Sequence, residues 1–240
     1  MSEDRLVNAY SGSDDAAAEH ALRPKSLDDF IGQHRVREQI DVLLKAARQR
    51  GAAADHILLS GPPGLGKTTL AMILASEMQS PIRISSGPAI THAGDLAAIL
   101  SSLVEGEILF LDEIHRFSKA QQDALLPAVE NGWLILVAAT TENPSFSIIA
   151  PLLSRSLIVR LEQLNDQDVD ALITRATDSP SGLGGLVAID PDARGAIVRL
   201  AQGDAGAGLD GVNPDFRKDG CGAHGAIVAK TGEPDGPALK

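Results

Sequence analysis

The stretch of sequence that decides the fold is Gly61–Thr68, which reads GPPGLGKT. It matches the whole G-x-x-x-x-G-K-[ST] pattern, follows the apolar run 57–59 and opens a helical stretch that continues to Met78. Glycines in this pattern let backbone N–H groups curl around phosphates, and the helix N-terminus adds positive potential. A chance match is expected in roughly 1% of chains of this length. The stretch therefore predicts a nucleoside triphosphate site, with Lys67 on the β- and γ-phosphates and the Thr68 hydroxyl on Mg²⁺.

A pair of carboxylates, Asp112 and Glu113, follows the continuous apolar run Ile108–Leu111. Because the carboxyl ends of parallel strands meet at one edge of a sheet, we expect both side chains beside the phosphate loop. Asp112 is suited to hold Mg²⁺ through its water shell, and Glu113 to orient and deprotonate the attacking water. An isolated Asp-Glu pair after a strand is more often a solvated strand end. Its spacing from the phosphate loop favours the metal site.

Short apolar runs alternate with helical stretches through the first two thirds of the chain. This alternation is typical of a parallel sheet covered on both faces. We therefore predict an α/β fold of the P-loop NTPase type, with a parallel five-stranded sheet and helices on both faces. The predicted strands are Ile57–Leu59, Ile82–Ile84, Ile108–Leu111, Leu134–Ala139 and Leu157–Val159.

The chain divides into four predicted segments. A flexible acidic leader (1–20) precedes the nucleotide-binding α/β domain (21–163), a partial α-helical lid (164–205) and a Gly-rich tail (206–240). The lid is expected to contain two helices, near 166–177 and 191–201, with no strand between them. The tail has no apolar periodicity, and we expect it to be disordered.

Charge and composition limit the classes of function. The formal net charge is −11, so contact with DNA would need a local patch, a pore in an assembly or another subunit. Cys221 is the only cysteine, which excludes an internal disulfide and a cysteine-based metal cluster. No apolar run approaches the roughly 20 residues of a membrane helix, and no signal-peptide pattern is present. We expect a cytoplasmic protein without membrane contact.

Polar residues after the run Leu134–Ala139 are candidates for sensing the γ-phosphate and positioning water. Thr141 is the first choice and Asn143 the second, the alternative being an ordinary polar turn. Arg155 lies where one subunit could present a guanidinium to its neighbour's γ-phosphate, although a lone arginine is usually a solvated surface charge. His115 is expected to have a structural or coupling role, because no second His or Cys lies at ligand spacing.

These residues together resemble two families of AAA+ ATPases of bacterial DNA repair. Residues 22–116 resemble RuvB, the Holliday-junction branch-migration motor, and residues 117–205 resemble RarA (MgsA), the replication-associated recombination protein A. The first resemblance rests on Leu22-Arg23-Pro24, Phe30-Ile31-Gly32-Gln33, the phosphate loop, Ser86-Gly87-Pro88-Ala89 and Asp112-Glu113-Ile114-His115-Arg116. The second rests on Phe117–Asp123, Ala139–Phe146, Leu152–Arg155 and Ser181–Gly185.

The resemblance implies an AAA+ fold and a role for each matching position. Leu22 and Arg23 would lie against the adenine and the nucleotide, and Arg155 matches the position of the trans-acting arginine. The implied cofactors are ATP and Mg²⁺. The nucleotide-binding set is Leu22, Arg23, Gly61, Pro62, Pro63, Gly64, Leu65, Gly66, Lys67, Thr68 and Thr69. The metal ligands are Thr68 and Asp112, and the catalytic set is Glu113, Arg155, Thr141 and Asn143.

The resemblance also implies an ATP hydrolase of the helicase type that remodels branched or single-stranded DNA in recombination and repair. The implied process is Holliday junction branch migration or the processing of stalled replication forks. The family assemblies are hexamers for RuvB and tetramers for RarA. Residues 130–133 form only a tight turn where RuvB has the hairpin that contacts RuvA, which argues against a RuvA contact. Gly206 stands where both families place a lid arginine. Two alternatives stay open: a nucleotide-binding module with impaired turnover, and an ATP-switched loader that acts on protein partners.

Overall fold

The centre of the molecule is a five-stranded parallel sheet in the order β2-β3-β4-β1-β5. The computed structural model describes residues 23–50, 55–90, 93–180, 184–185, 187–210, 212 and 227–229. Neighbouring strands of this sheet are parallel throughout, which confirms the predicted α/β class. The strands are β1 (His56–Ser60), β2 (Ile82–Ser86), β3 (Ile108–Asp112), β4 (Ile135–Thr140) and β5 (Ser156–Arg160).

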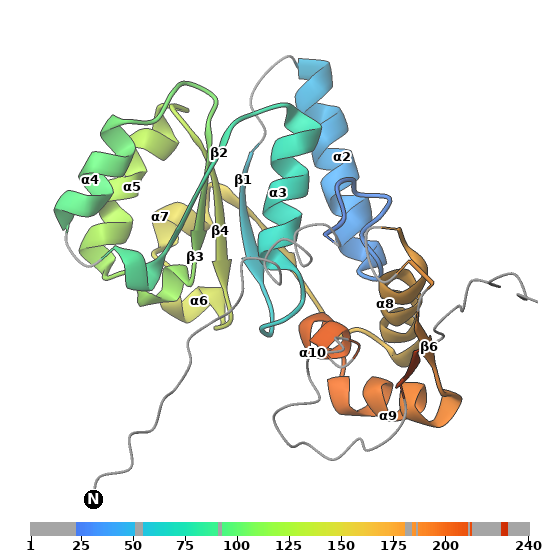
Figure 1. Ribbon diagram of the computed structural model, residues 1–240. Coiled ribbons are helices and arrows are strands. Elements are labelled where there is room, and N and C mark those ends of the chain that lie inside the picture. Colours follow the sequence, from blue (N-terminus) through green and yellow to red (C-terminus); the bar gives the residue numbers. More distant parts are fainter. Residues whose placement is uncertain are drawn as a thin grey trace, which may run out of the picture.

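Helices cover both faces of this sheet (Figure 1). Alternate strand residues point to opposite faces, so Ile57 and Leu59 join one apolar core while Leu58 joins the other. The first core is closed by α2 (His34–Arg50) and α3 (Lys67–Met78). The second is closed by α4 (Ala93–Ser101), α5 (Lys119–Glu130) and α7 (Ala150–Leu153). The remaining short helices of this part are η1 (Gly87–Ala89), η2 (Ile114–Arg116) and α6 (Pro144–Ser147).

The start of α5 follows the sequence pattern closely. The Ser118 hydroxyl accepts a hydrogen bond from the Gln121 backbone N–H, and the Gln121 side chain accepts one from the Ser118 N–H. This reciprocal pair satisfies backbone donors that the first turn of a helix leaves without intrahelical acceptors. Ser118 and Gln121, three positions apart, therefore form a capping box at the start of α5.

A small helical lid follows the sheet and lies close to the phosphate-loop edge in Figure 1. It contains α8 (Asp166–Asp178), β6 (Val187–Ile189), α9 (Pro191–Ala201) and α10 (Ala205–Asp210). The expectation of no strand between the two lid helices is wrong, because β6 pairs antiparallel with β7 (Ile227–Ala229). A strand this short gives no periodic signal, and its partner lies far along the chain.

The predicted boundary at residue 206 lies inside α10, and β7 also falls within the predicted tail. The other parts of that tail, residues 211, 213–226 and 230–240, lie outside the described residues. The predicted leader, 1–20, lies outside them as well. The four segment boundaries stay predictions.

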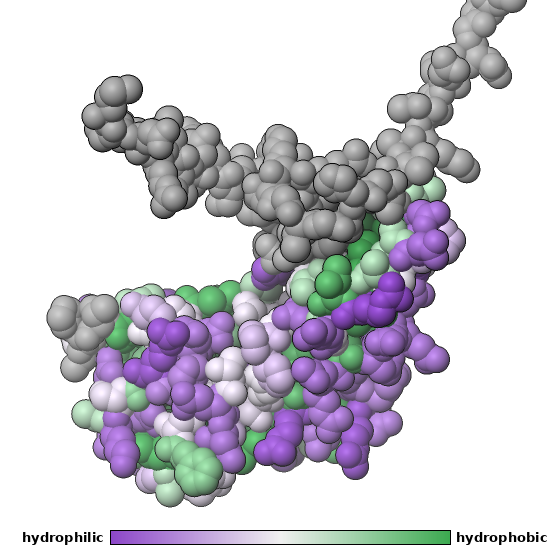
Figure 2. Space-filling model, turned by 90° about the horizontal axis from the view of Figure 1, so that it is seen from below, coloured by the Kyte–Doolittle hydropathy of each residue, from purple (hydrophilic) through white to green (hydrophobic). Residues whose placement is uncertain are grey.

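The surface drawn in Figure 2 is mostly hydrophilic over the described residues, with smaller apolar patches between the polar ones. Large exposed apolar side chains include Phe146 and Leu200. Among the described residues, no helix combines the length and apolar character needed to cross a bilayer.

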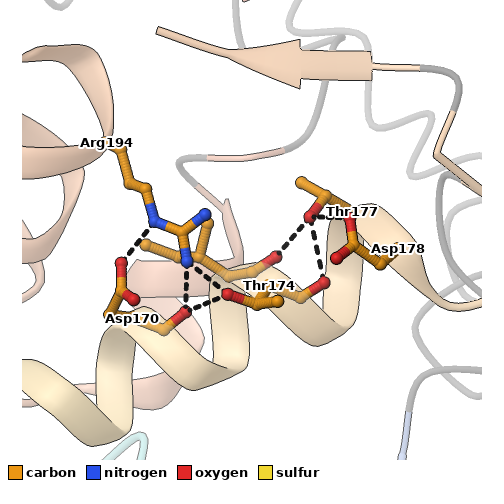
Figure 3. A network of polar contacts seen from close by, with 6 residues as sticks. Asp170, Thr174, Thr177, Asp178 and Arg194 are labelled. Atoms are coloured by element: carbon orange, nitrogen blue, oxygen red, sulfur yellow. Dashed lines mark hydrogen bonds and ion pairs between the residues drawn. The ribbon is translucent and has the colours of Figure 1, made fainter. Parts of the chain in front are cut away.

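Arg194 of α9 joins the two longest lid helices by a polar network (Figure 3). Its guanidinium forms an ion pair with the Asp170 carboxylate and donates to the Asp170 backbone oxygen at 2.9 Å and to the Thr174 hydroxyl. Asp170 and Thr174 lie one helical turn apart on α8, so one planar group contacts both. This network fixes α9 against α8.

Replacing Arg194 with Ala should lower the free energy of unfolding by about 1 kcal/mol, because the charge-assisted hydrogen bonds are lost at a partly exposed site. Urea unfolding followed by circular dichroism measures this change. Arg199→Ala is the matched control, since Arg199 is exposed on the same helix. Equal destabilisation by both variants would contradict a specific contribution of the network.

Candidate nucleotide site

The phosphate loop connects β1 to α3 at the carboxyl edge of the sheet. Gly66 has a left-handed backbone (φ 79°) and directly precedes α3. A β-carbon at Gly66 would lie 3.0 Å from the ring of Phe30, so the loop packs closely against this side chain. Because the first N–H groups of a helix have no intrahelical acceptor, this bend aims free donors at the space above the loop. Such a cradle suits an anionic phosphate chain.

Lys67 is the buried cation of this loop, with 8% of its surface exposed. Its ammonium donates to the backbone oxygens of Gly61 at 2.9 Å and Pro62 at 2.6 Å. Burial lowers the pKa of Lys67, while the nearby carboxylates of Asp112 and Asp204 act in the opposite direction. Among the described residues, no carboxylate lies within ion-pair distance of this ammonium. A buried ammonium bound only to carbonyl oxygens fits a site that gains a phosphate.

Asp112 ends β3 and Glu113 follows it, at the same edge of the sheet. The Asp112 carboxylate accepts the Glu113 backbone N–H at 2.9 Å, and it is close enough to Lys67 to raise the pKa of that lysine against the larger effect of burial. Glu113 has a left-handed backbone (φ 52°), and its carboxylate pairs with Arg116 at 3.2 Å. The structure therefore places Asp112 near the phosphate loop. The Glu113 carboxylate instead pairs with Arg116, three residues further along the chain.

A metal at this position would have few protein ligands. Thr68, in the first turn of α3, and Asp112 supply oxygen atoms of the kind Mg²⁺ prefers. Within the described residues there is no cluster of three or more His, Cys, Asp or Glu side chains that could hold a metal. This donor set fits Mg²⁺, which usually binds one or two protein oxygens together with waters and phosphates.

Thr140, which sequence reasoning passed over, has the contacts expected of a residue next to the phosphate loop. It is 1% exposed at the end of β4, and its hydroxyl lies 3.1 Å from Nδ1 of His115. Its backbone oxygen accepts the N–H of Gly61 at 3.2 Å. Thr140 therefore joins the phosphate loop to His115, and the structural or coupling role expected for that histidine stays a prediction.

The two residues predicted to sense the γ-phosphate lie beyond the end of β4. Thr141 is exposed, and the Asn143 side chain caps α6 by accepting the Ser145 N–H at 3.1 Å. No contact of the described residues joins either side chain to the phosphate loop. Their catalytic roles stay predictions.

Arg155 lies at the amino ends of the strands, opposite the end of the sheet that carries the phosphate loop. It directly precedes β5, which runs parallel to β1, so it is separated from the phosphate-loop edge by the length of the strand, roughly 16 Å. Its guanidinium pairs with Glu130 at 2.7 Å and donates to the Pro151 backbone oxygen at 2.9 Å. In this position Arg155 is remote from its own phosphate loop and faces outward, with 41% of its side chain exposed.

The N-terminal part of the predicted nucleotide set is described only in part. Leu22 lies outside the described residues. Arg23 is half-buried beside α3, with its guanidinium 3.8 Å from the sulfur of Met72. The Gln33 side chain donates to the backbone oxygen of Glu162 at 2.5 Å and accepts its N–H at 3.1 Å. These two hydrogen bonds connect Gln33 to the linker between β5 and the lid.

The other members of the nucleotide set belong to the loop and the first turn of α3. Pro62, Pro63 and Gly64 are exposed, and Leu65 is buried beneath them at 3% exposure. Thr68 and Thr69 are half-buried in the first turn of α3. The structure thus presents the exposed backbone of the loop above the buried Leu65 side chain.

Comparison with known proteins places this site in a family. The family model "Holliday junction DNA helicase RuvB P-loop domain" matches residues 22–159. The Holliday junction branch migration complex subunit RuvB of Streptomyces griseus is 67% identical over 129 residues, covering 54% of this chain and 36% of the relative. The same subunit of Streptomyces avermitilis is 47% identical over 213 residues, covering 81% of this chain and 58% of the relative.

The fold of a solved relative agrees with these matches. The Thermotoga maritima RuvB Holliday junction branch migration motor superposes with a TM-score of 0.70 at 42% identity, covering 79% of this chain and 63% of that one. This chain thus spans only about a third to three fifths of the length of these curated and solved relatives.

The RuvB match extends past residue 116, where motif comparison placed its end. The separate short motifs placed the end of the RuvB resemblance too early, because the family model matches through residue 159. The resemblance of residues 117–205 to RarA is not shown by these comparisons and stays a prediction. With its family match over residues 22–159 and a five-stranded AAA+ sheet around an intact phosphate loop, the chain belongs to the RuvB P-loop domain family.

Proposed function

We propose that this chain binds ATP with Mg²⁺ at Gly61–Thr68 and hydrolyses it in an oligomer that remodels branched DNA. The observation that carries the proposal is the buried Lys67 ammonium at the edge where Asp112 ends β3. Among the described residues, its hydrogen bonds go to the loop carbonyl oxygens of Gly61 and Pro62. Membership of a family whose relatives are named as Holliday junction branch migration subunits supports the DNA substrate. Because the chain is acidic, contact with DNA is most readily made through an assembly of subunits. We propose that the protein acts in the cytoplasm.

Each residue of the site has a distinct part in this proposal. Lys67 and the loop N–H groups bind the β- and γ-phosphates, while Thr68 and Asp112 hold Mg²⁺. Mg²⁺ held by these two residues would supply positive charge that offsets the charge of the phosphates. Glu113 orients the attacking water and takes its proton. Arg155 acts on the site of the neighbouring subunit, because it lies at the far edge of its own sheet.

Replacing Lys67 with Ala should weaken binding of MgATP by about 100-fold, since a buried ammonium that contacts phosphate oxygens is lost. Titration calorimetry of the whole chain with MgATP measures the affinity. Lys45→Ala is the matched control, because Lys45 is exposed on α2 in an ion pair with Asp41. If Lys67→Ala binds MgATP as tightly as the parent, the proposed site is wrong.

A second candidate function is a nucleotide-binding module without turnover. It is motivated by Gly206 in the first turn of α10, where the lid arginine is expected from the family resemblance. This module would be stabilised by nucleotide and would not hydrolyse it. DNA-stimulated hydrolysis by the parent chain excludes this candidate.

The macromolecular partner can be tested separately from the nucleotide. An ATP-switched loader acting on proteins would share the same site, and the net charge of −11 does not by itself favour DNA. Fluorescence anisotropy with a labelled four-way junction at about 50 mM salt distinguishes the two, because phosphate contacts are strongest at low salt. Absence of binding in the presence of MgATP favours the protein partner.

A further inference from the structure

Asp204 of the lid lies directly on the phosphate loop. A β-carbon added to Gly64 would meet three carboxyl atoms of Asp204 at 2.0–2.1 Å, so the carboxylate occupies the space beside the Gly64 α-carbon. The next residue reinforces this contact, because the Ala205 N–H donates to the Gly64 backbone oxygen at 3.2 Å. The lid and the loop therefore touch through one acidic side chain and one backbone hydrogen bond.

The backbone on both sides holds Asp204 in this place. Gly203 has a left-handed backbone (φ 78°), and its oxygen accepts the Leu164 N–H at 3.1 Å. The Asp204 N–H donates to the Ala201 oxygen at 2.8 Å, while its carboxylate accepts the Ala207 N–H at 3.0 Å. A side chain fixed by these bonds is not a freely moving surface carboxylate.

The charge of Asp204 has no close counter-ion among the described residues, since none of their ion pairs includes it. The cation that it affects is Lys67, whose pKa it raises against the larger effect of burial. Phosphates bound by Lys67 would thus come close to a second anion. Like charges in such a partly buried setting repel each other.

We infer that Asp204 sets the nucleotide affinity of the phosphate loop, because its carboxylate on Gly64 opposes the entry of anionic phosphates. This inference rests on the proposed function. Nucleotide binding and docking of the segment 203–205 on the loop then compete. The opposition is stronger for ATP than for ADP and stronger without Mg²⁺, since each change adds negative charge beside the carboxylate.

The variant Asp204→Asn tests this inference without removing the helix cap, because asparagine also accepts a backbone N–H at an N-cap. The matched control is Asp190→Asn, which makes the same change at the cap of α9, where Asp190 accepts the Asp192 N–H at 2.9 Å. Binding of N-methylanthraniloyl-ATP and -ADP to the full chain is measured by fluorescence, with and without Mg²⁺, at about 50 and 500 mM salt.

Asp204→Asn should bind the ATP probe about three- to tenfold more tightly than the parent at low salt, with a smaller gain for ADP and at high salt. Asp190→Asn should match the parent within about twofold. Equal or weaker binding by Asp204→Asn overturns the inference, provided that the parent binds. If neither the parent nor Asp204→Asn binds either probe, the proposed nucleotide site fails and the inference fails with it.

Discussion

Arg155→Ala should lower the rate of ATP hydrolysis in the assembled protein by about 10³-fold while leaving MgATP affinity within about twofold of the parent. The guanidinium lies before β5, at the end of the strands opposite the phosphate loop, so the site that we propose it completes belongs to a neighbouring subunit. There it would stabilise charge that develops on the transferred phosphoryl group. Phosphate release under DNA-stimulated conditions measures the rate, and calorimetry measures the affinity.

The position of Arg155 allows a test by mixing subunits. Lys67→Ala subunits lack a phosphate site but keep Arg155, while Arg155→Ala subunits keep the site. A mixture should therefore hydrolyse ATP faster than either variant alone. Arg48→Ala is the matched control, because Arg48 is also an exposed arginine in a 2.7 Å ion pair, with Glu77. Unchanged turnover by Arg155→Ala, or no recovery on mixing, would remove the trans-acting role.

The ion pair with Glu130 holds the Arg155 side chain in a definite position within its own subunit. Glu130 ends α5 and Arg155 follows α7, so the contact joins two helices on the same face of the sheet. About half of each side chain is exposed, and such pairs contribute little to stability. A neighbour's phosphate can therefore compete for the guanidinium at small cost.

The parts of the fold that could be predicted from sequence are those with strong local signals. The apolar runs 57–59 and 108–111 are buried strands, and the glycines of the loop mark the turn between strand and helix. The Ser118 cap likewise depends on two residues three positions apart in the sequence, Ser118 and Gln121. Such signals depend on neighbours along the chain, so no knowledge of tertiary contacts is needed.

The parts that sequence could not predict depend on contacts between distant segments. Thr140 and Thr141 are identical residues side by side, and only packing places Thr140 against His115. Asp204 gives a helix-cap signal, which contains no information about its contact with Gly64. The pairing of β6 with β7 joins residues about 40 positions apart, one of them in a Gly-rich stretch.

Glu113→Gln should lower ATP turnover by about 10³-fold, because the amide cannot accept a proton from the attacking water. Binding of MgATP should stay within a few-fold of the parent, since Lys67, Thr68 and Asp112 are unchanged. The exposed residue Glu142 provides the matched control, Glu142→Gln, on the neighbouring strand end. Rates are measured by phosphate release with a four-way junction present.

The Arg116 contact makes this prediction more specific. Because the Glu113 carboxylate pairs with Arg116 at 3.2 Å, it must leave that partner before it can reach a water at the phosphate loop. Arg116→Ala should therefore keep or raise turnover, whereas Glu113→Gln should lower it by about 10³-fold in either background. Parent-like turnover by Glu113→Gln would mean that another group accepts the proton. In that case Asp112, whose carboxylate already accepts the Glu113 N–H beside Lys67, is the next residue to test.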